Sequence, residues 1–349
     1  MTATAAPAVV ASARPRALSQ RLIDLGAASC AAWLMVGLYL DGWAHNTQLP
    51  DSFWTPWHAV LYSGYGALAA FLALVAGTRL RAGLPPRSAI PEGYAPSVLG
   101  ALVFGVGGVF DMLWHTFVGI ERGLDTLFSP SHLMLAVGIV LLVSGPLRSV
   151  WRRGALARPS FDSAIALASI LMLFLMFTFM SQFSTPFAFT PGTPGDARYG
   201  ELGQIRALFG VLTFTAVLVS LCLLALREGV LPPGSITVLL LADAVAMMLM
   251  RSSVRPEQRE VMLATAAAAG IVGDVLLWRL RPGRRSLVAV RVVATALPAS
   301  FFGIYFGLVA LRIGTWWTPH SVTGMAVLAG LSGLVLSYLV FPRRETPGA

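Results

Sequence analysis

The sequence predicts an all-α integral membrane protein, a polytopic bundle of about ten transmembrane helices. Of its 349 residues, 56% are hydrophobic and only 12% are charged. Apolar runs of about 20 residues, each long enough to cross a bilayer, recur along almost the whole chain. Closed barrels are the other architecture that satisfies the backbone in lipid, and they lack such runs. The lipid bilayer is therefore the first expected partner.

The apolar runs divide the chain into two halves behind an N-terminal segment. Residues 1–20 are rich in alanine, contain Arg14 and Arg16, and are predicted to be a disordered cytoplasmic tail. A removable signal peptide is not expected, because no small-residue cleavage site follows a short apolar core. Residues 21–151 hold four spans, and residues 152–349 hold six spans and a short C-terminal tail. The expected spans are residues 21–44, 56–78, 96–117, 130–151, 161–183, 204–226, 231–251, 259–280, 289–312 and 320–341.

The basic residues indicate an orientation rather than a nucleic-acid surface. The net charge is +9, but the arginines gather in short loops that follow even-numbered spans. By the positive-inside rule both termini then face the cytoplasm, as in a bacterial plasma membrane protein. The loop containing Arg251, Arg255 and Arg259 breaks this pattern. In this orientation all five histidines lie at outer ends of spans: His45, His58, His115, His132 and His320.

One constellation of polar residues occurs twice in the first half. "DGWAHNTQLPDSFWTPWH" begins at Asp41, and "DMLWHTFVGIERGLDTLFSPSH" begins at Asp111. Both start with Asp-x-x-x-His at the end of an expected span. Both continue, after a loop, with Asp-[Ser/Thr]-x-aromatic-[Ser/Thr]-Pro-x-His. Spans one and two therefore read as a duplicate of spans three and four.

The spacing in each copy favours a metal site. Asp and His four residues apart project from the same face of a helix. Thr55 and Ser129 are suitable N-caps followed by proline, which places His58 and His132 in the first turn of the next helix. One carboxylate and two imidazoles can then converge across a helical hairpin. Such a set with open positions suits copper, iron or zinc.

Other polar residues are candidates for supporting roles. Asp51 and Asp125 are expected as acceptors for an imidazole N–H or as additional ligands. Glu121 lies in the loop of the second copy. It could accept a hydrogen bond from an imidazole, act as an additional ligand, or simply be a solvated charge. His320, in "TWWTPHS", keeps the Thr-Pro start but lacks Asp-x-x-x-His, so it either completes a site or lines a cavity.

The duplicated pattern resembles the copper-binding motif of the C subunit of particulate methane and ammonia monooxygenases. The first copy matches the family's ligand spacing, Asp-x3-His-x12-His. In the second copy, the residues "DTLFSPSH" are more similar to the family's Asp-Thr-x-Phe-Thr-Pro-Ser-His, but the loop is four residues longer. The resemblance covers roughly residues 38–140, and the family subunit carries the motif once. It implies copper ligands at Asp41, His45, His58, Asp111, His115 and His132.

Three functions follow as hypotheses. The resemblance implies a copper-dependent membrane monooxygenase that oxidises a small apolar substrate with dioxygen, alone, as a homo-oligomer or with other membrane subunits. A non-catalytic copper-handling protein is the second, favoured by a stripe of Met172, Met176 and Met180 that leads toward the histidines. A zinc-dependent membrane hydrolase is the third, with Glu121 or Asp125 as its general base.

Two carboxylates lie inside expected spans, outside the duplicated motif. Asp243 belongs to span seven and Asp274 to span eight. A carboxylate within the membrane is a functional candidate by default, because an unpaired charge there is costly. A proton relay and a partner for an arginine both remain open for these two residues.

Overall fold

The computed structural model describes residues 18–49, 54–119, 123–154, 160–229, 231–251 and 254–342. These residues form helices joined by loops, and the β-type pairing among them is limited to one isolated bridge between Gly283 and Ser286. The described part contains nine helices long and apolar enough to cross a membrane, and a shorter apolar helix, α11. The predicted all-α membrane bundle is therefore confirmed.

The helices that correspond to the ten expected spans follow them to within a few residues. They are α1 (Gln20–Asn46), α2 (Pro56–Arg81), α4 (Ala95–Phe117), α6 (Pro130–Val143), α7 (Gly145–Arg153), α8 (Phe161–Met180), α10 (Gly200–Glu228), α11 (Ser235–Met250), α12 (Pro256–Leu280), α13 (Leu287–Arg312) and α14 (Pro319–Val340). Short elements connect them: α3 (Pro86–Ala89), α5 (Asp125–Phe128), α9 (Pro186–Phe189) and the 3-10 helix η1 (Pro194–Tyr199).

The fourth span differs from the expectation because it consists of two helices, α6 and α7. The boundary is Ser144, and Pro146 stands in the first turn of α7. Proline has no N–H to donate to a preceding carbonyl, so the helix is interrupted there. The Ser144 hydroxyl donates to the carbonyl of Val140 and satisfies one of the groups left at the end of α6.

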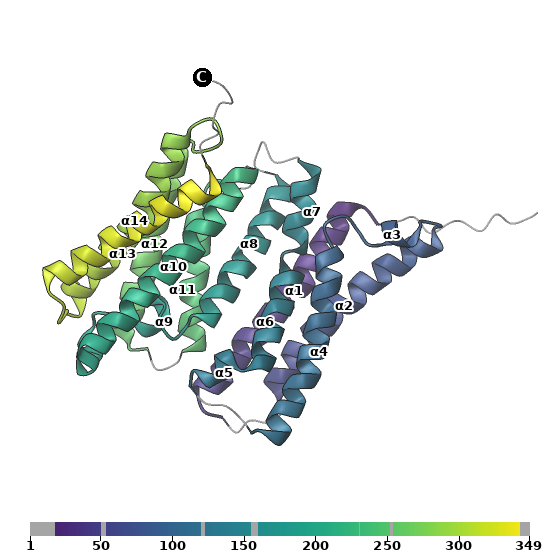
Figure 1. Cartoon of the computed structure of the whole chain (residues 1–349), viewed down its shortest axis with the longest axis horizontal. Coiled ribbons are helices and arrows are strands. Elements are labelled where there is room, and N and C mark those ends of the chain that lie inside the picture. The colour runs from purple at the N-terminus through teal and green to yellow at the C-terminus, as the bar shows by residue number, and fades with distance from the viewer. Residues whose placement is uncertain are drawn as a thin grey trace, which may run out of the picture.

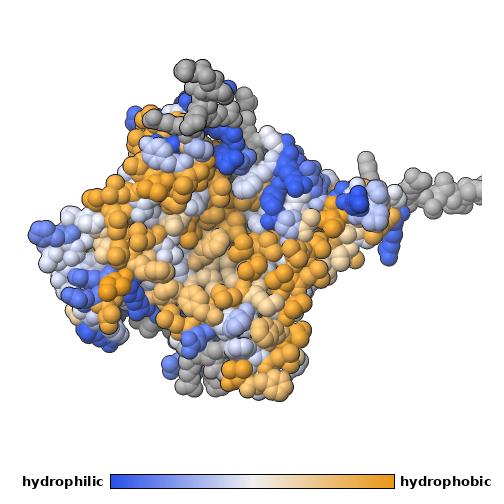
Figure 2. All heavy atoms as spheres, viewed as in Figure 1, coloured by the Kyte–Doolittle hydropathy of each residue, from blue (hydrophilic) through white to orange (hydrophobic). Residues whose placement is uncertain are grey.

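The helices form one bundle with the two N-terminal hairpins along one edge. Figure 1 shows α2 and α4 at one side, α13 and α14 at the other, and α8 between them. The start of α1 and the end of α14 lie at the same end of the bundle (Figure 1), as an even number of crossings requires. A broad apolar face lies between two ends richer in polar residues (Figure 2), which is the surface that contacts the lipid bilayer.

The first hairpin packs closely because glycines stand where α1 meets α2. A methyl group added at Gly37 would lie 2.5 Å from the Cα of Leu61. A methyl group at Gly64 would lie 2.7 Å from the Cα of Leu34. Only glycine therefore permits this approach of the two backbones.

The second hairpin, α4 with α6, uses glycines at the corresponding motif positions. A methyl group at Gly107 would lie 3.3 Å from the backbone nitrogen of Leu135. A methyl group at Gly138 would lie 2.9 Å from the Cα of Phe104. The glycines correspond in position: Gly37 and Gly107 each precede the motif Asp by four residues, and Gly64 and Gly138 each follow the second motif His by six.

A charged network fastens the end of the bundle where α1 begins. The buried Asp24 carboxylate accepts from Arg153 at 2.6 Å and from the Tyr94 hydroxyl at 2.9 Å. Burial and the charge of Asp24 raise the pKa of Tyr94, which precedes α4. Arg153 also reaches Asp162 at 3.0 Å, and Arg21 pairs with the same carboxylate. Buried charges are thus paired and link α1, α7 and α8.

The two carboxylates inside the later spans have different surroundings. Asp274 on α12 accepts from the backbone N–H groups of Ile236 and Thr237, both at 3.1 Å, and from the Thr237 hydroxyl at 2.6 Å. It therefore caps the N-terminus of α11 from a neighbouring helix. Asp243 is completely buried and accepts from the Thr178 hydroxyl at 2.6 Å.

Candidate metal centres

The first centre joins the end of α1 to the start of α2. Asp41 and His45 lie one turn apart on α1, and His58 lies in the first turn of α2. The Asp41 Oδ1 atom is 3.1 Å from His58 Nε2 and 3.8 Å from His45 Nε2. The three side chains are thus brought together across the hairpin.

The second centre repeats this arrangement between α4 and α6. Asp111 and His115 lie near the end of α4, and His132 follows the start of α6. His132 Nε2 is 3.2 Å from Asp111 Oδ1, and His115 Nε2 is 3.5 Å from Asp111 Oδ2. The Asp111 side chain is 3% exposed, against 14% for Asp41, so the second carboxylate is the more deeply buried.

Both groups could hold a metal ion. In each, one donor atom per residue lies within 4.8 Å of the other two. Bonds of about 2 Å to a common ion separate donors by about 3 to 4 Å, so small shifts suffice for coordination. Asp41 Oδ1 and Asp111 Oδ1 are buried, and neither accepts a hydrogen bond from the described residues. A buried carboxylate oxygen without such a bond is costly, and a bound cation removes that cost.

Hydroxyl groups at the helix starts orient one imidazole in each centre. The Thr55 hydroxyl is 3.1 Å from His58 Nδ1, and the Ser129 hydroxyl is 2.8 Å from His132 Nδ1. Ser129 also accepts from the backbone N–H of His132 at 3.4 Å, whereas Thr55 makes no such capping bond. Each hydroxyl engages Nδ1 and leaves Nε2 directed at the carboxylate, which is how outer partners orient metal-ligating histidines.

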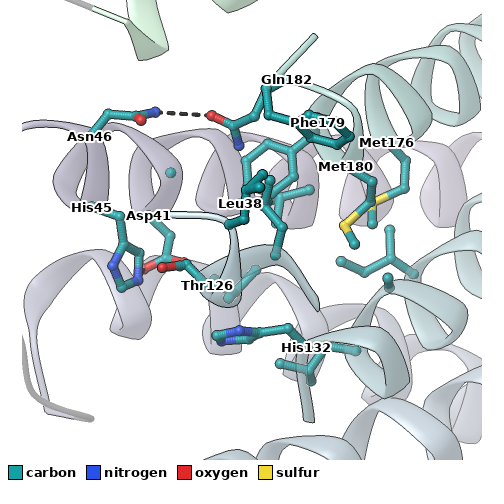
Figure 3. A pocket seen from close by; sticks show the side chains of 18 of the residues that line it. Leu38, Asp41, His45, Asn46, Thr126, His132, Met176, Phe179, Met180 and Gln182 are labelled. Atoms are coloured by element: carbon teal, nitrogen blue, oxygen red, sulfur yellow. Dashed lines mark hydrogen bonds and ion pairs between the residues drawn. The ribbon is translucent and has the colours of Figure 1, made fainter. Parts of the chain in front are cut away.

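The two centres open onto one cavity of about 290 Å³. Asp41, His45 and His58 line it from the first hairpin, and Asp111 and His132 from the second. Figure 3 shows side chains of both hairpins around this space. A molecule in the cavity would therefore contact both candidate centres.

The second half of the chain completes the cavity wall. Figure 3 places Met176, Met180 and Gln182 around the pocket, and Gln182 accepts from the Asn46 amide at 3.2 Å. Two of the three methionines in the stripe thus line the cavity onto which the centres open. Arg206 and Arg251 also line the cavity, and neither was predicted from the sequence to lie there. The signal for Arg251 was its loop, which carries more positive charge than the other loops on its side.

The remaining candidates lie apart from both centres or outside the described residues. Asp125 is exposed at the start of α5 and does not line the cavity. His320 is exposed at the start of α14, which packs on α13 and α10 at the far edge of the bundle (Figure 1). It belongs to neither group of potential ligands. Asp51 and Glu121 lie outside the described residues.

Comparison with known proteins leaves the two centres to be judged on their own geometry. No family model, no curated protein and no solved structure matches the chain.

Proposed function

We propose that the protein is a copper-dependent membrane oxidoreductase in which each Asp-His-His group binds one copper ion. The observation that carries the proposal is the double convergence of one carboxylate and two imidazoles on a shared cavity. Two nitrogen donors and one oxygen donor with open positions suit copper. The same donors also suit iron and zinc. Copper is proposed because the ligand pattern resembles that of the C subunit of particulate methane and ammonia monooxygenases.

The protein's own residues would hold, orient and shield the ions. The aspartates and histidines bind them, and the Thr55 and Ser129 hydroxyls fix the direction of two imidazoles. Apolar side chains such as Leu38 and Phe179 restrict water in the cavity. Copper with open coordination positions would supply the reaction with dioxygen. By the resemblance, the substrate is small and apolar.

The duplication of the hairpin belongs to this proposal. Its support is the equal placement of the glycines in the two hairpins, where Gly37 meets Leu61 and Gly107 meets Leu135. We also place the centres at the outer face of a bacterial-type plasma membrane, with both termini cytoplasmic. The support is the arginine distribution, together with the position of the centres at the end of the bundle opposite the start of α1.

A non-catalytic copper-handling protein is the second candidate. The specific observation in its favour is that Met176 and Met180 line the same cavity as the histidines. Thioethers are soft ligands that suit Cu(I), and a methionine lining beside an imidazole site is compatible with transfer of the ion. The two candidates share the metal and differ in whether a substrate is oxidised.

Metal analysis of the purified protein tests the proposal. The native chain should retain one copper ion per group and give a Cu(II) electron paramagnetic resonance signal with nitrogen couplings. His58→Ala should lose one ion, His132→Ala the other, and the double variant both. His320→Ala is the matched control, since it removes an exposed imidazole apart from both groups, and its copper content should equal that of the native chain.

The outcomes separate the candidates. Retention of zinc alone, or of no metal, refutes both copper proposals. Loss of both ions in either single variant shows one shared centre and refutes the assignment of one ion to each group. Oxygen uptake coupled to oxidation of a small substrate, with a quinol as reductant, supports the enzyme. Full copper content without any oxygen uptake, together with exchange of Cu(I) that Met176→Leu and Met180→Leu slow, supports copper handling.

A further inference from the structure

Two arginines that are not predicted metal ligands contribute positive charge to the cavity wall. Arg206 comes from α10, and Arg251 stands just beyond the last residue of α11. Both are half-buried. The Arg206 Nε group donates to the carbonyl of Phe183, which holds its guanidinium at the cavity.

The Arg251 guanidinium has no partner within the part of the chain that the structure describes. It makes no side-chain hydrogen bond there, and no described carboxylate oxygen lies within 4.0 Å of it. Burial and, second, the positive charge of Arg206 lower the pKa of Arg251. A half-buried cation beside another cation is unfavourable unless an anion compensates it.

The acidic groups of the cavity do not serve as that anion. Asp41 and Asp111 each lie within 4 Å of two imidazoles, in the candidate metal centres. The other titratable groups lining the cavity are His45, His58, His132 and Tyr62. Among the residues that the structure describes, no carboxylate lining the cavity is left to compensate Arg251, and a bound anion would do so.

The rest of the lining restricts what this ligand is. Leu38, Leu61, Phe104, Ile139 and Phe179 give the cavity an apolar portion. Its volume of about 290 Å³ is at the lower end of the range for small-molecule sites and too small for a phospholipid. Guanidinium groups bind planar carboxylates with two parallel hydrogen bonds.

We propose that the cavity binds a small organic carboxylate with a short aliphatic chain. The carboxylate is held by Arg206 and Arg251, and the chain lies against the apolar portion, beside the two Asp-His-His groups. A carboxylate differs from the apolar substrate that the resemblance implies by its charged head. Oxidation of this carboxylate would rest on the proposed function, whereas its binding does not. The charged head also distinguishes this cavity from a site for an uncharged gas.

Titration calorimetry on the purified full-length protein tests the inference, with hexanoate as the probe. Hexanamide has the same chain without the charge, and inorganic phosphate has charge without the chain. Hexanoate should bind at least about tenfold more tightly than either, because a hydrogen-bonded ion pair contributes about 1.5 to 3 kcal/mol. Arg251→Gln should weaken hexanoate binding by at least about tenfold, and Arg251→Lys by less.

Arg255→Gln is the matched control, since it removes an exposed positive charge from the same loop without changing the cavity. Its hexanoate affinity should equal that of the native chain. Thermal unfolding verifies that each variant is folded, and copper content is measured in the same samples. Arg251→Gln should retain all its copper, because it touches none of the predicted ligands.

Three results count against the inference. Equal binding of hexanoate and hexanamide excludes a role for the charge. Equal binding of hexanoate and phosphate shows that the apolar portion of the cavity does not contribute to hexanoate binding. Unchanged hexanoate affinity in a folded Arg251→Gln variant that keeps its copper shows that the carboxylate binds elsewhere, for example to the metal. If the native protein holds no copper but its hexanoate binding depends on Arg251, the proposed oxidoreductase fails and the carboxylate site stands.

Discussion

Replacing Ser129 by alanine should weaken metal binding at the second centre alone. The Ser129 hydroxyl lies 2.8 Å from His132 Nδ1, and the residue is 6% exposed, so water cannot readily replace it. Loss of a buried hydrogen bond costs about 1 to 1.5 kcal/mol, which corresponds to about tenfold in affinity. Loss of a partner that orients a metal-ligating histidine lowers metal affinity by about 10- to 100-fold, so we expect a decrease of at least tenfold.

The same substitution should also destabilise the start of α6. Ser129 accepts from the backbone N–H of His132 at 3.4 Å, and removal of such a cap costs about 1 kcal/mol. Thr55→Val is the matched variant in the first centre, because Thr55 contacts His58 Nδ1 at 3.1 Å without capping α2. Thr55→Val should weaken copper binding at the first centre and leave the stability of the metal-free protein nearly unchanged.

Competition with a copper chelator measures the two affinities, and thermal unfolding of the metal-free protein measures stability. The native titration should show two sites of high affinity. Ser129→Ala should show one such site and one at least about tenfold weaker. If both affinities stay within threefold of native, or if both fall equally, the hydroxyl does not orient a ligand and the reasoning is refuted.

Three further predictions concern the supporting structure. Gly37→Leu should separate α1 from α2 and remove copper from the first centre only. Gly66→Leu is the control and should keep all its copper, because a Cβ at this position meets open space. Equal copper contents in the two variants would contradict the prediction. Asp274→Ala should lower the free energy of unfolding by about 1 kcal/mol by uncapping α11, measured by chemical unfolding against native protein, and no change would exclude the cap. Arg153→Gln should cost about 3 kcal/mol because Asp24 stays buried without its cation, while a double Arg153→Gln, Asp24→Asn variant should recover part of it.

The fold and each separate centre follow from local sequence. The long apolar runs predict the spans because nothing else satisfies the backbone in lipid. Asp41 and His45 face the same way because four residues make about one turn, and Thr55 before Pro56 marks the start of the next helix. The approach of His58 to Asp41 then depends only on two consecutive helices. Local rules therefore suffice for each hairpin.

What local rules did not reveal depends on packing between distant helices. That both centres share one cavity results from the way α8, α10 and α11 close against the hairpins, and no spacing in the sequence encodes it. Arg206 reaches the cavity through its bond to Phe183, which lies 23 residues away. The Thr-Pro-His start near His320 resembled the motif, but without an Asp-x-x-x-His partner it gives only a capped helix.

The hairpin origin of the ligands has a consequence for how the protein is made. Each Asp-His-His group comes from two consecutive helices, so its ligands can meet as soon as that pair has entered the bilayer, long before the C-terminal helices are synthesised. Closure of the cavity must wait for Arg251, some 120 residues beyond His132. On the proposed function, copper loading and closure of the cavity are separate events in biosynthesis, and we expect a nascent chain arrested after α7 to bind both ions already.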